Sequence, residues 1–116
     1  MQPQDTGIEK RRAQRIRVNL AAQYRSNAVS LDGRVRDLSC DGMFLRSELL
    51  DSSGSTVSLE FRLPGGPSVH LDGEVVRVDN TPLGSGMAIR FVEVAMNVRR
   101  QLANYMLLQT SRNRVG

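Results

Sequence analysis

The sequence predicts a mainly β fold, a six-stranded antiparallel β-barrel of Greek-key or meander type with a C-terminal α-helix. Between residues 18 and 91 there are six short runs, most of which have apolar residues at every second position, and polar or glycine-rich segments separate them. Alternation with a period of two is typical of strands that bury one face. From about residue 95 the apolar spacing becomes three to four, which indicates one helix packed on the barrel.

The clearest expected strand spans residues 56–63, where Val57, Leu59, Phe61 and Leu63 alternate with polar residues. The other strands are expected at 18–24, 31–35, 43–45, 69–78 and 87–91, with turns at 50–55, 64–67 and 79–86. In the run at 69–78 the apolar positions slip by one residue near Gly73. Such a slip predicts a β-bulge of the kind that lets barrel strands curve.

The predicted domain organisation is simple. Residues 1–8 are expected to be a disordered lead-in, and 9–112 one domain with an N-terminal arm at 9–17 and a helix at about 95–110. Residues 113–116 are expected to be a tail. The helical stripe of Val98, Leu102, Tyr105 and Met106 predicts core packing. In an alternative interpretation, Met106 and its two following leucines form an apolar patch for a partner or a second copy.

The composition favours an anionic partner and argues against an enzyme. The net charge is +4, and of sixteen basic residues only Lys10 is a lysine. One histidine and one cysteine leave no metal cluster, and no nucleophile has catalytic spacing. His70 alternates with apolar residues and is expected on the outer face of a strand. Cys40 is expected to be a passive filler of its turn, with a redox-sensitive thiol as the alternative. No apolar run is long enough for a membrane helix or a signal peptide, which predicts a cytoplasmic protein.

Two short stretches carry the candidate binding chemistry. Arg11 and Arg15 lie four residues apart just before the first strand, with Arg12 between them and Lys10 ahead. Downstream, Asp37 and Ser39 lie two apart at the end of the second strand, a spacing that would put both side chains on one strand face. Gly42 follows where the chain turns, at a position expected to need positive φ or close backbone approach.

Guanine requires this pairing of groups. An arginine fork meets its O6 and N7 acceptors bidentately, and a carboxylate accepts from its N1–H and N2–H groups. Phosphates would take the remaining arginine charge. A ligand with two guanines and two phosphates would therefore use the whole set.

The paired stretches resemble a known family. "RRAQR" with "DLSCDG" is similar to the RxxxR and [D/N]xSxxG motifs of PilZ domains, bacterial receptors for cyclic di-GMP, and "GMAIRF" at 86–91 looks like the family's last strand. The resemblance covers about residues 9–110. It implies a non-catalytic receptor without a cofactor, whose arm closes on the ligand and presents a surface to a protein partner. The family implies motility, pilus, flagellar or polysaccharide machinery as that partner.

The resemblance also implies roles for individual residues. Arg11 and Arg15 would bind the phosphates and the guanine Hoogsteen edge, Asp37 and Ser39 the guanine and adjoining polar groups, and Gly42 would shape the turn. Arg12 would add charge or stack on a base. Arg77 and Gly86 are possible additional site residues. Lys10 would help to offset the four negative charges of an intercalated ligand pair, which favours two ligands over one.

Two rival interpretations stay open. In the first, the basic arm and the arginines near the C-terminus bind nucleic acid or regulate transcription, although few aromatic residues are available for stacking. The salt dependence of binding would distinguish this interpretation from a guanine-binding pocket. Nucleic-acid affinity falls steeply between low and moderate salt, whereas the affinity of such a pocket should fall much less. In the second, the chain is an adaptor that acts only through protein partners.

Overall fold

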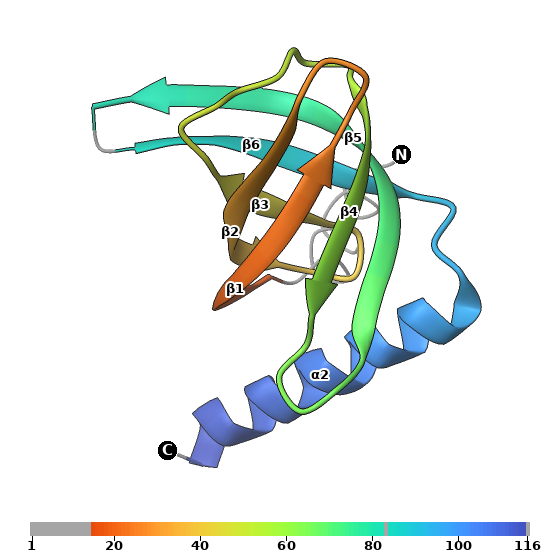
Figure 1. Ribbon diagram of the computed structural model, residues 1–116. Helices are drawn as coiled ribbons and strands as arrows, with labels where there is room; N and C mark the ends of the chain where they lie inside the picture. Colours follow the sequence, from red (N-terminus) through yellow and green to blue (C-terminus); the bar gives the residue numbers. More distant parts are fainter. Residues whose placement is uncertain (1–14, 83, 116) are drawn as a thin grey trace, which may run out of the picture.

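The computed structural model describes residues 15–82 and 84–115. In this part of the chain six strands form a closed barrel, and one helix lies across one end of it (Figure 1). The strands are β1 (Ile16–Arg25), β2 (Ser30–Leu38), β3 (Gly42–Arg46), β4 (Thr56–Arg62), β5 (Ser68–Thr81) and β6 (Gly84–Val92), and the helix is α2 (Met96–Val115). The predicted fold class is confirmed.

The strands follow the order β1-β2-β3-β6-β5-β4 around the barrel, and β4 pairs with β1 to close it. Every neighbouring pair is antiparallel. The chain therefore makes two three-stranded meanders, β1–β2–β3 and β4–β5–β6, which join where β3 pairs with β6. Closure satisfies backbone groups that an open sheet would leave at its edges.

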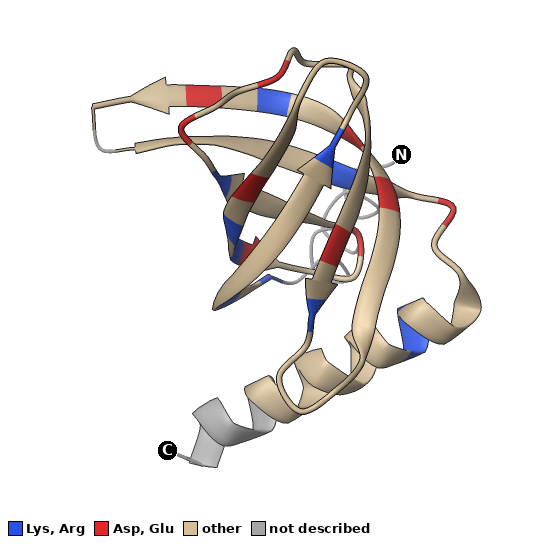
Figure 2. Cartoon of the chain, viewed as in Figure 1, with Lys and Arg blue, Asp and Glu red and all other residues tan. Residues whose placement is uncertain are grey.

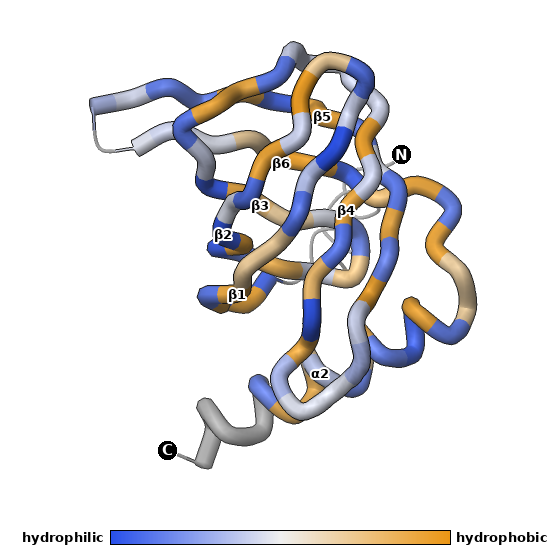
Figure 3. Tube along the Cα trace, viewed as in Figure 1, coloured by the Kyte–Doolittle hydropathy of each residue, from blue (hydrophilic) through white to orange (hydrophobic). Residues whose placement is uncertain are grey.

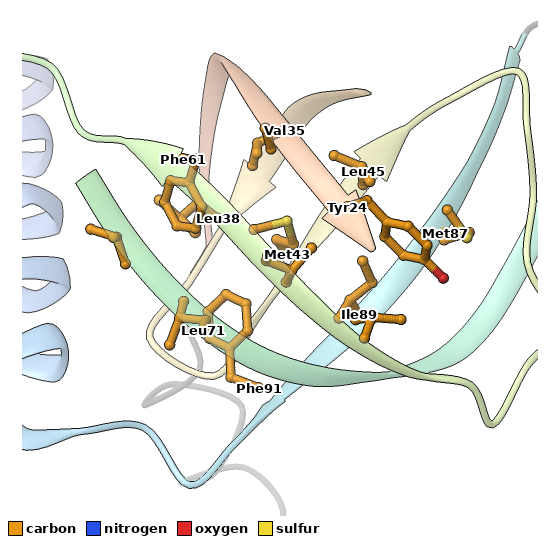
Figure 4. Packing of buried hydrophobic residues seen from close by; sticks show 14 of the residues in the cluster. Tyr24, Val35, Leu38, Met43, Leu45, Phe61, Leu71, Met87, Ile89 and Phe91 are labelled. Carbon is orange, nitrogen blue, oxygen red and sulfur yellow. The ribbon is translucent and has the colours of Figure 1, made fainter. Parts of the chain in front are cut away.

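The barrel interior holds the core. Apolar and polar residues alternate along the strands (Figure 3), and the apolar ones point inward, as Figure 4 shows for Tyr24, Leu45, Met87 and Ile89 among others. Each of these four side chains is at most 2% exposed. Burying one large apolar side chain contributes about 1.5–3 kcal/mol to the stability of the folded state. The apolar face of each strand therefore points into the shared interior, and the opposite face points outward.

Helix α2 covers one end of the barrel (Figure 1). Leu102 is fully buried, and Val98, Tyr105 and Met106 pack against the core, which confirms the predicted stripe. Two differences from the expected boundaries concern the ends of the domain. The helix continues to Val115 instead of ending near residue 110, so most of the expected tail is helical. At the other end β1 begins at Ile16, inside the expected arm.

Two details of β5 and β6 differ from the sequence expectation. The bulge lies between Val75 and Arg77, because Gly73 stays in register with both neighbouring strands and Val76 is the extra residue. The strands also run into the expected turn at 79–86, forming a hairpin that projects beyond the barrel (Figure 1). Polar cross-links stabilise it: Thr81 Oγ1 donates to the Gly84 carbonyl (2.8 Å) and Ser85 Oγ to Asn80 Oδ1 (2.9 Å).

Candidate functional site

The turn between β2 and β3 is organised around one hydroxyl. Ser39 Oγ accepts hydrogen bonds from the backbone N–H groups of Asp41 and Gly42, both at 3.1 Å. The Ser39 N–H donates to the Gly42 carbonyl (2.9 Å), which closes the turn. Ser39 is only 4% exposed. Its hydroxyl thus fixes the turn, and the expectation that Ser39 shares a strand face with Asp37 does not hold because β2 ends at Leu38.

Gly42 is needed for close approach, one of its two expected reasons. A Cβ on Gly42 would overlap the carbonyl oxygen of Ile89 on β6. Its φ is not in the positive region. The preceding residue of the turn, Asp41, also contacts β6, because its carbonyl accepts the N–H of Phe91 at 2.8 Å. Asp41 and Gly42 at the end of the turn are therefore held against β6.

A hollow on the outside of the barrel lies beside this turn. It has a volume of about 460 Å³, and we call it the outer groove. It brings together three predicted site residues, Arg15 from the end of the arm with Ser39 and Gly42 from the turn. Its lining residues are Arg15, Ser39, Asp41, Gly42, Met43, Phe44, Val76, Ala88, Ile89 and Arg90.

The floor of the outer groove is apolar and comes from β3, β6 and β5. Phe44 pairs with Ala88 across β3 and β6, and the bulge residue Val76 is left 48% exposed beside them. The Phe44 ring lies over Gly86, where a Cβ would come within 2.5 Å of two ring carbons. Gly86, predicted as a possible site residue, thus supports the floor from beneath. A floor of this kind suits a flat ring system.

The two arginines at the outer groove differ in whether an acidic side chain neutralises them. Arg90 Nη2 donates to Glu74 Oε1 at 2.6 Å, so this guanidinium is neutralised. Arg15 is exposed and has no ion pair within the described residues. Among the described residues that line the outer groove, Arg15 is therefore the cation that remains available to an anionic ligand.

Asp37 lies one strand away from the outer groove and does not line it. On β2 it pairs with Arg17 of β1 on one side and with Phe44 of β3 on the other. Since Phe44 forms part of the floor, Asp37 borders the groove from the side opposite β6. It is half-buried. A ligand that extends beyond Phe44 toward β2 would reach its carboxylate.

Of the remaining predicted residues, only Arg77 lies in the described part of the chain, and it is not brought to the outer groove. The Arg77 guanidinium is engaged by the Asp79 carboxylate through two contacts, at 3.1 Å and 3.3 Å, and Arg77 does not line the groove. Lys10, Arg11 and Arg12 lie outside the described residues. The RxxxR motif is thus represented by Arg15 alone.

Sequence reasoning missed Phe44, Val76, Ala88 and Arg90. A signal was present for two of them, since Phe44 lies between the inward-facing Met43 and Leu45, and Ala88 between Met87 and Ile89. An outward-facing aromatic residue in a strand suggests a contact surface. Val76 could not be placed without the position of the bulge.

Cys40, at the same turn, is half-buried. Burial, followed by the nearby Asp41 carboxylate, raises the pKa of its thiol, and the Arg99 guanidinium of α2 partly opposes this. A raised pKa disfavours the reactive thiolate. His70 is exposed on β5, as predicted, with Nε2 3.5 Å from Glu60 Oε2.

The described residues contain neither a metal-binding cluster nor a membrane-spanning helix. No group of three or more His, Cys, Asp or Glu side chains is arranged to hold a metal ion there. Within 15–82 and 84–115, no helix has the length and apolar character needed to cross a membrane.

The fold is shared with several solved structures. Bacillus subtilis inhibitor of motility (MotI/DgrA) matches with a TM-score of 0.81 and 20% identity over 90% of this chain and 53% of its own, so this chain spans about half its length. The PilZ domain with c-di-GMP of YcgR from Escherichia coli gives 0.72 and 20% over 90% and 93%. Borreliella burgdorferi PlzA in complex with c-di-GMP gives 0.65 and 16% over 88% and 43%.

Sequence comparison gives the family directly. No curated protein matches the chain. A family model described as PilZ domain, however, matches residues 9–108, a span that includes both the arm and the β2–β3 turn. On the strength of this match over most of its length, the chain belongs to the PilZ domain family.

Proposed function

We propose that this chain is a non-catalytic receptor that binds cyclic di-GMP at the outer groove. The observation that carries the proposal is the meeting of Arg15, Ser39 and Gly42, which come from two separate sequence motifs, around one apolar floor. Membership of the PilZ family supports it, as do the c-di-GMP complexes of the structurally similar YcgR domain and PlzA.

Each residue has a chemical role in this proposal. Arg15, together with Arg11, binds phosphate oxygens and the O6 and N7 acceptors of guanine through its fork. Asp37 accepts from the N1–H and N2–H groups of a guanine that extends over Phe44. Ser39 acts chiefly by holding the turn, because its oxygen already accepts two backbone N–H groups.

The floor provides the apolar contact. A guanine ring lying on Phe44, Val76 and Ala88 would bury its face while its edges meet Arg15 and Asp37. Arg12 and Lys10 add positive charge from the arm, which favours a stacked pair of ligands with four phosphate charges. In this proposal ligand binding changes the surface formed by the arm and the turn, and a protein partner recognises that change.

Isothermal titration calorimetry of cyclic di-GMP at about 150 mM salt tests the proposal. We expect a roughly micromolar Kd, near −8 kcal/mol. Arg15→Ala should weaken binding about 10- to 100-fold, since a bidentate arginine contact is worth about 1–3 kcal/mol. Arg62→Ala removes an exposed arginine of β4 and serves as the matched control, with unchanged affinity.

The fitted stoichiometry distinguishes one ligand from two. No heat at high protein concentration would contradict the receptor proposal. Oligonucleotide affinity that exceeds the affinity for cyclic di-GMP and collapses between 50 and 200 mM salt would favour the nucleic-acid alternative.

A further inference from the structure

Three arginines form a second basic surface on the outside of the barrel. Arg34 and Arg36 on β2 and Arg46 at the end of β3 are all exposed, and we call them the arginine surface. Figure 2 shows the basic residues of β2 and β3 on the same side of the barrel. Arg34 and Arg46 are directly opposite each other in the β2–β3 register. Like charges at opposed positions destabilise a sheet, so an anion bound at this pair would relieve the repulsion between them.

No anion of the described chain supplies that compensation. Within residues 15–82 and 84–115, none of the three arginines has a carboxylate within 4.0 Å. Arg34 Nε donates to Asn19 Oδ1 at 2.9 Å, which orients the guanidinium without neutralising it. Arg46 lies against Gly84 of β6, where a Cβ would be 2.6 Å from Nη2. The Arg34 guanidinium is thus oriented by a hydrogen bond, the Arg46 guanidinium lies beside Gly84, and the charge of both is unmatched among the described residues.

The arginine surface borders concave surface. A groove of about 640 Å³ runs between it and the β5–β6 hairpin, and it is lined by Ala21, Asp32, Gly33, Arg34, Arg46, Ser47, Glu48, Thr81, Pro82, Gly84 and Ser85. A smaller hollow of about 120 Å³ adjoins Arg36, Arg46 and Phe44. The projecting hairpin therefore makes one wall of a channel whose other wall carries the arginines.

We propose that the arginine surface binds an acidic segment of a partner protein, lying in the channel between β2–β3 and the β5–β6 hairpin. Arginine forks pair bidentately with carboxylates, and a fork that is already oriented, as in Arg34, loses less entropy when it does so. The acidic residues at the margin decide against nucleic acid. Asp32 and Glu48 line the same groove, and Asp79 lines the smaller hollow.

A sugar–phosphate backbone carries a charge at every nucleotide and would meet the carboxylates of Asp32 and Glu48 on leaving the arginines, whereas the Asp79 carboxylate is already paired with Arg77. A peptide can place carboxylates at the arginines and neutral or basic residues at the margin. The described part of the chain also offers only one aromatic residue here, Phe44, which is too few for a base-stacking platform.

The arginine surface adjoins the outer groove through Phe44, which lines both that groove and the smaller hollow. A partner seated on the arginines would therefore lie beside any ligand in the outer groove. The proposal stands without the nucleotide, since none of the three arginines lines the outer groove.

Fluorescence anisotropy at 50 mM salt tests the proposal with two labelled probes, a peptide of six glutamates spaced by Gly-Ser and the oligonucleotide dT12. Arg34→Gln/Arg46→Gln should weaken peptide binding at least fivefold. Arg25→Gln/Arg62→Gln removes the same charge from β1 and β4 and should change it less than twofold. Arg11→Gln/Arg15→Gln, the arm variant, should likewise change peptide binding less than twofold.

Amide chemical shifts of the wild-type protein give a second readout that does not depend on how the variants fold. On peptide addition the largest changes should fall on β2, β3 and the β5–β6 hairpin. Absence of peptide binding, equal loss in the two surface variants, loss in the arm variant or tighter binding of dT12 at these arginines would each overturn the proposal. Cyclic di-GMP titrations of the same variants test the receptor proposal separately, so the peptide-binding proposal can fail while the receptor proposal holds, and the reverse.

Discussion

Gly42 of β3 lies so close to Ile89 of β6 that a Cβ on Gly42 would overlap the Ile89 carbonyl oxygen. This contact locks the β2–β3 turn onto the strand that provides Ala88 and Arg90 to the outer groove. The glycine of the DxSxxG motif is therefore required by strand packing, and the backbone angle does not demand it. Fold and site depend on the same atom-level contact.

Gly42→Ala should force β3 away from β6 and distort the turn. We expect a loss of about 1–3 kcal/mol in the free energy of unfolding, as for overpacked sites, and a fall in cyclic di-GMP affinity. Urea unfolding measures the first and calorimetry the second. Gly66→Ala is the control, because a Cβ there would meet its nearest neighbour at 3.6 Å. Equal stability of the two variants would contradict the close-approach account.

Ser39→Ala should loosen the turn by removing the acceptor of two backbone N–H groups. We expect a stability loss of about 1 kcal/mol and weaker nucleotide binding. Ser58→Ala deletes an exposed hydroxyl that makes one long contact to Asp72 (3.4 Å) and should cost less than about 0.5 kcal/mol. Full nucleotide affinity in Ser39→Ala would show that the site does not depend on the turn geometry.

Val76→Glu should block the outer groove by electrostatics. The side chain is 48% exposed at the bulge, so the substitution needs no repacking of the core, but it places a carboxylate on the floor. Cyclic di-GMP affinity should fall at least tenfold in Val76→Glu and less in the neutral, similarly sized Val76→Gln. Calorimetry of both variants compares charge with bulk. Unchanged affinity in Val76→Glu would show that the ligand does not bind on this floor.

Asp51 ties the β3–β4 loop to β1, and its contribution should depend on pH. Tyr24 Oη and Ser26 Oγ donate to Asp51 Oδ2 at 2.8 Å and 2.6 Å. The bond from Ser26, aided by that from Tyr24 and by the Ser52 N–H, holds the pKa of Asp51 below its ordinary value of 3.8. A lowered folded-state pKa adds stability above the unfolded pKa, and this is lost as the pH falls through the folded-state value.

Asp51→Asn should therefore destabilise the protein at pH 7 by about 1 kcal/mol and by less at pH 3. Urea unfolding at the two pH values measures the difference. An equal or larger effect at pH 3 would show that the ionised carboxylate is not what stabilises the loop.

Cys40 should react slowly with iodoacetamide. Because burial and Asp41 raise the pKa of its thiol, the thiolate fraction at pH 7.5 should be lower than in glutathione. Alkylation followed by mass spectrometry gives both rates. Faster alkylation of Cys40 than of glutathione would restore the redox-sensitive interpretation.

Most of the barrel was predictable because a buried interior imposes alternation on every strand that surrounds it. Val57, Leu59 and Phe61 reveal β4 in this way. The sequence predicts a turn where the β5–β6 hairpin lies, because the hairpin residues beyond the barrel, such as Asn80 and Ser85, face no core and show no alternation. The bulge at Val76 was misplaced because its position depends on pairing with β6.

The candidate site divides in the same way. Arg15, Ser39 and Gly42 could be chosen from the sequence by residue type and spacing, and the structure brings them together. The floor could not be predicted from the sequence, because Phe44, Ala88 and Val76 come from three strands. The sequence alone does not specify the register of these strands relative to one another. The arginine surface depends on register too, since it is pairing that opposes Arg34 to Arg46.

The measurement that tests the central claim most directly is a two-dimensional amide NMR titration of the protein with cyclic di-GMP. The account predicts the largest shift changes at Ser39 to Gly42, Phe44, Val76, Ala88 and Arg90, the turn and floor of the outer groove. Saturation with changes confined to the far side of the barrel, around Gln23, Glu60 and His70, would contradict the proposed site. A spectrum that does not change at all would contradict the receptor function itself.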